Sequence, residues 1–338
     1  MFLQQTTPGQ GAAILRGLKG SELLHLVDGM RLNNAIFRNA PTQYLALIAP
    51  RNVTRIEVVR GAPTSLYGSD AVGGVVQVLS RIPQFDTDKT AWRGDAHTAF
   101  DTGELGKQLG ITVEAGNRAI AGLFSASYLE TGNRRTGSGQ RFGPSGYSSS
   151  SLRAALSFTP DDSREWLIDY QFARQPSTPR IDELIAGFGE AEPASAEFRF
   201  APNERHFAHA RYMHADGYLA ANWRVDLGWQ RIVDDRITRN LGSSQRRREF
   251  NSSDLFGVTV TADREIGAGS WIAGVEFYDD TVESERFETD IDSGLVTTRT
   301  ARFPDGSSVQ QAALFANLSM PLGERNAIAA GFQGQRQW

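Results

Sequence analysis

Cysteine is absent from the 338-residue sequence, which excludes disulfide bonds, thiolate metal sites and cysteine nucleophiles. Long apolar runs are missing too, because stretches such as 45–49 fall far short of the roughly 20 residues that a transmembrane helix needs. Neither sign of charge dominates, since 35 Lys and Arg face 39 Asp and Glu, and a broadly basic nucleic-acid surface is not indicated. If this protein spans a membrane, it does so with strands.

The usual catalytic signatures are also lacking. There is no P-loop, H-E-x-x-H, G-x-S-x-G or dinucleotide glycine fingerprint, so we expect no enzyme and no cofactor. The segment 290–294 has half of a calcium-loop pattern without its later glutamate, and we interpret it as a hairpin tip rather than a metal site. The N-terminus shows no basic segment followed by an apolar core, so no signal peptide is recognisable.

The N-terminal region is compact and punctuated by glycine. Apolar runs predict strands at 22–27, 30–33, 54–59 and 74–79 and a short helix or turn at 43–48. Asp28 and Gly29 stand between the first two strands, where their tolerance of positive φ favours a two-residue hairpin turn. Gly68, Gly73 and Gly74 permit close backbone approach where a strand leaves a turn. We predict a small α+β unit.

From Trp92 onward, apolar and polar residues alternate with a period of two, which places one set on each face of a sheet. The alternation is clearest at 152–159, 166–173, 223–230, 258–262 and 312–320. Long polar stretches at 132–151 and 176–203 separate some strands. Tight turns at 160–162 and 266–269 join others. This arrangement is typical of an outer-membrane barrel, although a soluble β-sandwich or propeller would also alternate.

Four segments of the N-terminal region follow one another in order. They are ILRGL at 14–18, LHLVDGMR at 24–31 followed by LNN, IEVVRG at 56–61, and YGSDAVGG at 67–74. The series resembles the plug domain of TonB-dependent outer-membrane receptors. The structural positions of this motif are Asp28, Gly29, Tyr67, Gly68, Gly73 and Gly74. A looser similarity, over 175–212, is to receptors of the haem, haemoglobin and transferrin group.

The resemblance implies a small α+β plug domain followed by antiparallel transmembrane β-barrel strands. In that family a scarce ligand binds on the extracellular side, and TonB pulls on the plug to open a path. The expected ligand is haem or a ferric siderophore, with cobalamin or an oligosaccharide as the alternative ligand. The alternative to a membrane receptor is a soluble β-rich ligand-binding module. The expected partners are TonB, the outer membrane and this iron ligand, and no nucleic acid.

The resemblance also points to two sets of side chains. Asn34, Phe37 and Arg38 occupy a loop that corresponds to a ligand-facing plug apex, and they offer an amide, a stacking face and a cation. Glu57 and Arg60 are charges on a strand that should be largely enclosed, so we expect partners for them on the inner barrel wall. An ordinary surface loop and an exposed strand edge are the respective alternatives.

We place the domain boundary after residue 85, with a partial plug domain at 1–85 and the N-terminal part of the barrel at 86–338. The second region has room for about ten to twelve strands. Plugged transporters need roughly twenty-two. The chain is therefore expected to be a fragment with an incomplete barrel, without the TonB-contacting segment and ending inside a strand.

The histidines do not assemble into a haem site. His206 and His214 should lie on one face of a strand and His209 on the other, so their rings do not converge. His25 is expected to be a core residue of the plug, and His97 is expected to be structural.

Overall fold

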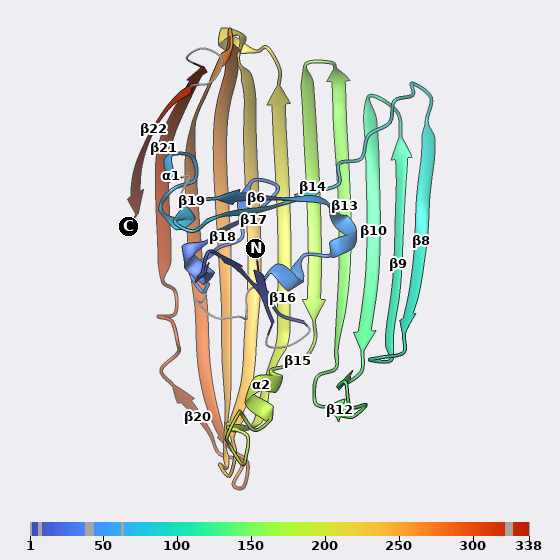
Figure 1. Cartoon of the computed structure of the whole chain (residues 1–338), viewed down its shortest axis with the longest axis vertical. Helices are drawn as coiled ribbons and strands as arrows, with labels where there is room; N and C mark the ends of the chain where they lie inside the picture. The colour runs from blue at the N-terminus through green and yellow to red at the C-terminus, as the bar shows by residue number, and fades with distance from the viewer. Residues whose placement is uncertain (1, 6–8, 38–43, 62–63, 322–326, 338) are drawn as a thin grey trace.

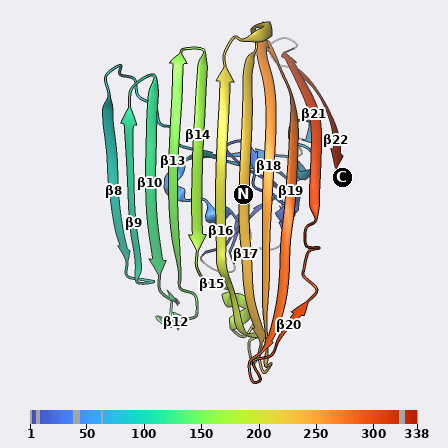
Figure 2. The ribbon, with the colours of Figure 1, turned by 180° about the vertical axis from the view of Figure 1, so that it is seen from behind.

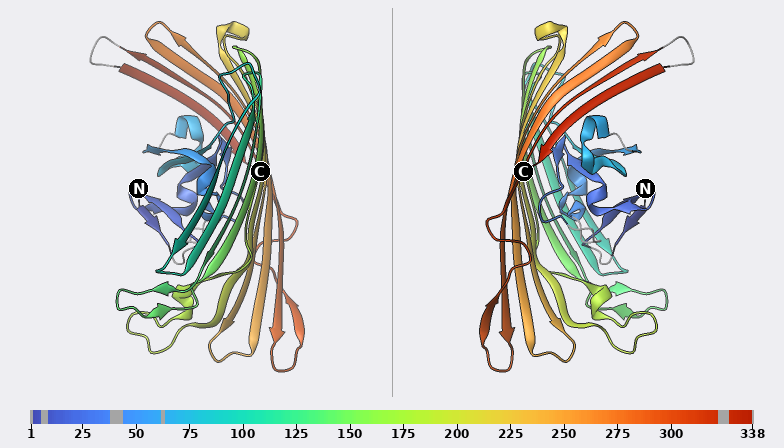
Figure 3. Two further views of the ribbon diagram at one scale, coloured as in Figure 1. Left: turned by 90° about the vertical axis from the view of Figure 1, so that its right-hand side faces the viewer. Right: turned by 90° about the vertical axis from the view of Figure 1, so that its left-hand side faces the viewer.

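The computed structural model describes residues 2–5, 9–37, 44–61, 64–321 and 327–337. A small N-terminal unit, the plug, lies against one face of a tall curved sheet, the wall (Figure 1). Seen from behind, the wall passes across the plug, and the side views place the plug on its concave face (Figures 2 and 3). No helix within the described ranges is both long and apolar enough to cross a membrane.

Two small sheets form the plug. The first has the order β1-β2-β3, with strands at Phe2–Gln4, Ala12–Leu15 and Leu18–Lys19. The second has the order β5-β4-β7-β6, with β4 at Leu24–Val27, β5 at Met30–Arg31, β6 at Val53–Arg60 and β7 at Gly74–Ser80. The helical pieces are α1 at Thr64–Tyr67 and 3-10 turns at Gly20–Glu22, Leu45–Leu47, Pro50–Asn52 and Ser69–Ala71. The predicted α+β unit is confirmed.

Strand β4 at the centre of the plug is buried on both faces, which explains why its sequence, Leu-His-Leu-Val, does not alternate between apolar and charged residues. Leu15, Leu23 and Val76 pack together on one side of this sheet. His25, 1% exposed, is a core residue as expected. The hairpin turn is confirmed as well, because Asp28 and Gly29 adopt φ angles of 53° and 90°.

The wall is a thirteen-stranded sheet whose neighbouring strands all pair antiparallel. Along its main path lie β8 (Ala91–Asp101), β9 (Gly106–Gly116), β10 (Ile120–Thr131), β13 (Tyr147–Asp161), β14 (Arg164–Gln175), β16 (Ser195–His214), β17 (Asn222–Asn240), β18 (Gln245–Ile266), β19 (Gly269–Asp290), β21 (Ser308–Pro321) and β22 (Ala327–Gln337). β15 (Thr178–Pro179) pairs with β16, and β20 (Val296–Arg299) pairs with β19. In the described part of the chain β8 and β22 are the two edges, so the sheet is an incomplete barrel, and the eleven strands of its main path fall within the predicted range of ten to twelve.

The connections differ between the two ends of the wall. One end carries β15, β20, the hairpin of β11 (Arg134–Arg135) and β12 (Arg141–Phe142), and α2 (Ile181–Leu184), at the bottom of Figure 1. The other end has short turns, such as 162–163 and 267–268. Long loops at one end and short turns at the other are thus present as predicted.

Two stretches predicted as connections are partly strand. β13 begins at Tyr147 and β16 at Ser195, so residues within 132–151 and 176–203 continue the ladder. The reason is that ladder hydrogen bonds join backbone groups and do not need apolar side chains. Ser148, for example, still pairs with Glu130 on β10.

The wall carries apolar side chains on its outer face and polar side chains on the face toward the plug, which is the reverse of a sheet in a water-soluble protein. On β14, Trp166 and Ile168 are 50% and 62% exposed, whereas Leu167 and Asp169 between them are 2% and 1% exposed. The outward set of this strand is apolar, and the set that faces the plug includes charged side chains. Apolar side chains that alternate outward in this way are typical of a barrel wall whose outer face contacts lipid.

Candidate functional site

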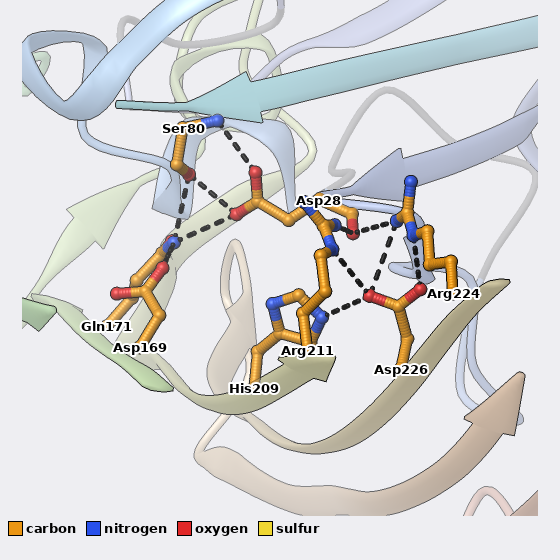
Figure 4. A network of polar contacts seen from close by, with 8 residues as sticks. All are labelled: Asp28, Ser80, Asp169, Gln171, His209, Arg211, Arg224 and Asp226. Atoms are coloured by element: carbon orange, nitrogen blue, oxygen red, sulfur yellow. Dashed lines mark hydrogen bonds and ion pairs between the residues drawn. The ribbon is translucent and has the colours of Figure 1, made fainter. Parts of the chain in front are cut away.

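The hairpin tip of the plug is anchored to the wall by two arginines (Figure 4). The guanidinium of Arg224 on β17 donates to the Asp28 carbonyl oxygen at 3.1 Å. Arg211 on β16 donates to the same oxygen. Charged donors make the stronger class of hydrogen bond, and both come from the wall, so the tip is tied to two neighbouring strands at once.

A single carboxylate holds these arginines in place. Asp226 on β17 is 3% exposed and accepts from Arg211 Nε at 2.8 Å and from Arg224 Nε. His209 Nε2 lies 2.7 Å from the same carboxylate. Because these groups are largely withdrawn from water, loss of the carboxylate would leave buried cations without their partner.

The Asp28 carboxylate joins the plug hairpin to the end of β7 and to β14. Ser80 donates to it through its backbone N–H and its hydroxyl, both at 2.7 Å. Gln171 on β14 donates to it at 3.3 Å and to Ser80 Oγ at 3.0 Å. Gln171 also donates to Asp169, which forms a fully buried ion pair with Arg153 at 2.9 Å. The network in Figure 4 is therefore continuous from the plug into the wall.

A second anchor, Arg31 at the end of β5, bridges the plug and a different part of the wall. It is 5% exposed and forms ion pairs with Asp70 of the plug at 2.7 Å and with Glu276 of β19 at 2.9 Å. Its guanidinium also lies 5.1 Å from the centre of the Tyr278 ring, and it is 3.5 Å from Gln311 on β21. One side chain thus joins β5 to two wall strands.

Close apolar contact supports these polar anchors. Met30 packs against Gly228 and Gly257, which lie opposite each other on β17 and β18. A Cβ atom on Gly228 would come within 2.5 Å of Met30 Cε, and one on Gly257 within 2.6 Å. The two glycines therefore allow the plug to approach the wall backbone where a larger side chain would hold it away.

The predicted apex residues that the structure describes border a cavity of about 310 Å³ between plug and wall. Asn34 and Phe37 line it together with Asp280, which accepts a hydrogen bond from the backbone N–H of Ala35. Phe37 also contacts the ring of His25. Burial lowers the pKa of His25 to about 4. Arg38 lies outside the described residues.

Glu57 and Arg60 are placed differently from the other predicted residues. Both are exposed on β6, and Glu57 forms an ion pair with Arg55 of the same strand at 2.8 Å. The contacts described for β6 do not join these two charges to the wall. Their assignment as a lock stays a prediction, while Asp28 and Arg31 make the plug–wall contacts that we observe.

Other predicted residues lie close to their expected places. Gly68 and Gly74 have positive φ angles of 87° and 135°, and Gly73 is packed against Leu23. Tyr67, at the end of α1, presents its carbonyl oxygen to Arg31 at 3.4 Å. These residues are in the plug motif, but none of them lies at the apex cavity.

The histidines are divided between the faces as predicted. His209 points inward to Asp226, whereas His206 is on the outer face, where its Nδ1 lies 2.8 Å from the Tyr170 hydroxyl. His97 is exposed on β8. No group of three or more His, Asp or Glu side chains in the described ranges is arranged to hold a metal ion.

Sequence reasoning missed the anchors on the wall. Gln171, Arg211 and Asp226 were visible only as polar members of alternating strands. A signal was available, because a polar set buried opposite an apolar set needs hydrogen-bond partners. What the alternation could not supply was the identity of those partners, which come from the plug.

A plug on the concave face of a lipid-facing strand wall defines the fold of a plugged outer-membrane barrel. The comparisons agree with this class: a family model described as the TonB-dependent Receptor Plug Domain matches residues 2–75. A stretch of 122 residues is 32% identical to the ferric aerobactin receptor of Klebsiella pneumoniae, covering 36% of this chain and 16% of that protein. Residues 2–75 thus match the plug domain of TonB-dependent receptors, and the strands that follow have the fold of a transmembrane barrel of the outer membrane.

Solved structures show the same fold. The copper transporter OprC superposes with a TM-score of 0.82 at 16% identity, over 99% of this chain and 50% of its own. The ferric yersiniabactin uptake receptor FyuA from Yersinia pestis gives 0.73 at 13% identity, over 99% and 52%. The chain spans about half the length of these structures and a smaller part of the aerobactin receptor. These relatives are transport receptors or transporters, not enzymes.

Proposed function

We propose that the whole receptor takes up a ferric siderophore across the outer membrane and that TonB supplies the work. The observation that carries this proposal is the polar attachment of the plug to the wall, through Asp28 and Arg31. A plug that never moved could be held by apolar packing alone. Ion pairs and hydrogen bonds can instead exchange with water once a pulling force separates the two surfaces.

The ligand is proposed to bind at the apex cavity, where Asn34 and Phe37 meet Asp280. Arg38 and the lock residues Glu57 and Arg60 belong to the same proposal. An iron ligand is supported by the sequence similarity to a ferric aerobactin receptor. A siderophore is favoured over haem because His209 is held by Asp226 and His206 points outward, so neither ring is directed to this cavity.

A path for the ligand is suggested by two cavities. The apex cavity of about 310 Å³ and a second cavity of about 180 Å³ share two lining residues, Arg31 and Tyr278. Arg31 closes the space between them through its pairs with Asp70 and Glu276. We propose that displacement of β5 withdraws this side chain and joins the cavities into a passage beside β19.

The test is growth of an iron-starved strain that carries the whole receptor, with and without a functional TonB. We expect growth on one ferric siderophore only when TonB is present. Growth on a siderophore without TonB would contradict the energy source. Growth restored only by cobalamin or an oligosaccharide would contradict the ligand class.

A further inference from the structure

The inner face of the wall carries an excess of arginine beyond the apex cavity. Two plug contacts identify which residues lie on this inner face: Ala35 donates to Asp280, and the Tyr44 hydroxyl donates to Asp234 at 3.2 Å. Every second residue of a strand shares a face, so Arg286 and Glu288 on β19 face the same side as Asp280. They lie six and eight positions further along, which places Arg286 about 20 Å beyond the cavity.

Strand register brings six charged side chains together there, and we call them the arginine ladder. Its members are Arg236, Arg247, Glu249, Arg286, Glu288 and Arg299. In one row Arg236 is opposite Glu249, Glu249 is opposite Arg286, and Arg286 is opposite Arg299. In the next row Arg247 is opposite Glu288. Four arginines and two glutamates leave the ladder with a net charge of +2.

The charges within the ladder are shared unevenly. Glu288 alone pairs with Arg286 at 2.7 Å, with Arg299 at 2.9 Å and with Arg247 at 3.4 Å. Glu288 is 14% exposed, whereas the side chains of Arg247 and Arg299 are 43% and 53% exposed. The carboxylate is therefore covered by guanidinium groups whose remaining N–H donors are accessible from the inner side of the wall.

Strand stability does not account for this arrangement. Like charges placed directly opposite each other destabilise a sheet, yet Arg286 and Arg299 are direct cross-strand neighbours. A wall needing only ion pairs would balance them one to one. In the next row outward, Asp290 accepts hydrogen bonds from Ser244, Gln245 and Ser293 and, among the described contacts, pairs with no arginine of the ladder, so counting its carboxylate reduces the local surplus from +2 to +1. The surplus of positive charge is explained if an anion binds to the ladder.

We infer that the arginine ladder captures the iron ligand by its carboxylates, so the transported complex is anionic and carries two or more of them. Guanidinium groups suit this task because their planar forks bind carboxylates through two parallel hydrogen bonds. A concave, positively charged inner surface also raises the local concentration of an anion before it reaches the apex cavity. The inference rests on the proposed uptake of an iron ligand and specifies its charge.

The same strands offer a matched control. On the inner face Arg247 and Arg299 share Glu288. On the outer face Glu197 is shared by Arg246, at 2.9 Å, and Arg199, at 3.1 Å. Changing either arginine pair to glutamine removes two charges and leaves one glutamate. The inner variant is Arg247→Gln with Arg299→Gln. The outer variant is Arg246→Gln with Arg199→Gln.

The experiment measures binding of ferric citrate and ferric aerobactin as anionic probes, ferrichrome as a neutral probe and ferrioxamine B as a cationic probe. The whole receptor is used in detergent, with TonB-dependent growth as a parallel readout. We expect an anionic probe to bind, its Kd to rise about ten-fold in the inner variant and with added salt, and less than about two-fold in the outer variant. A heat-modifiable electrophoretic mobility equal to that of the wild type establishes that each variant is folded.

Four results overturn parts of this scheme separately. TonB-dependent growth on ferrichrome or ferrioxamine B overturns the anionic ligand and leaves iron uptake standing. Inner and outer variants that weaken binding equally overturn the role of the arginine ladder. Growth on haemin, whose propionates are also carboxylates, keeps the charge assignment and overturns the siderophore. The absence of TonB-dependent growth on every iron source overturns the proposed function itself.

Discussion

The inner and outer faces of the wall are built from alternate residues of the same strands, yet they meet different surroundings. The outer face presents Trp166 and Ile168, while the inner face buries Asp169 and Gln171. The outer-face pair of Asp254 and Arg231 is about one-third exposed, whereas Asp226 on the inner face is almost fully enclosed. The difference teaches that the wall keeps its apolar side chains on the outer face of β14 and places the polar groups that anchor the plug on the inner face.

The largest expected effect comes from removing the carboxylate of the hairpin anchor. Asp226→Asn leaves Arg211, Arg224 and His209 without a counter-charge, and we expect a loss of about 3–5 kcal/mol in the free energy of unfolding. The matched change on the outer face, Asp254→Asn, should cost less than about 1 kcal/mol. Urea unfolding of the whole receptor in detergent measures both. Equal losses would remove the distinction between the faces.

Acid should weaken the plug through His25. Burial lowers its pKa to about 4, below the unfolded value of 6.5, so the unfolded state binds the extra proton in that range. Stability is therefore retained above pH 7, and about 3 kcal/mol is lost as pH falls from 6.5 to 4. The midpoint of urea unfolding at pH 7.5 and 4.5 tests this, with His25→Gln as the control. A variant with the same pH dependence as the wild type would rule out His25 as the cause.

Arg31→Ala should loosen the proposed passage. Loss of the guanidinium leaves Glu276 largely buried without its cation, and we expect plug retention to weaken by about 2 kcal/mol. In cells without TonB, the variant receptor should admit a large antibiotic that the wild type excludes. Arg55→Ala on exposed β6 is the control and should leave the cells impermeable. Leakage from the control alone would place the passage on the other side of the plug.

The smallest effect concerns the close approach of plug and wall. Gly228→Ala would push a methyl group against Met30, and we expect a loss of about 1 kcal/mol. Met30→Ala in the same chain should recover part of that loss by making room. Comparing the unfolding free energies of the two single variants and the double variant measures the coupling. Strictly additive losses would mean that Met30 and Gly228 do not share this contact.

Much of the fold is determined by local sequence. The positive φ angles at Asp28 and Gly29 follow from residues that tolerate them, and the alternation around Trp166 assigns each side chain of β14 to a face. The split of His206 and His209 follows from the same period of two. These features depend on backbone geometry over a few residues, and they were predicted from sequence.

Only the tertiary structure decided which polar groups meet. Asp28 and Gln171 lie more than a hundred positions apart, and Arg31 is 245 positions from Glu276, so no local pattern links them. The ladder likewise depends on register, because a shift of one residue would turn Arg247 and Arg286 to the outer face. Sequence alone identified a plug and the strands of a lipid-facing wall, whereas packing chose the contacts that join them, since those contacts form only when distant segments are brought together.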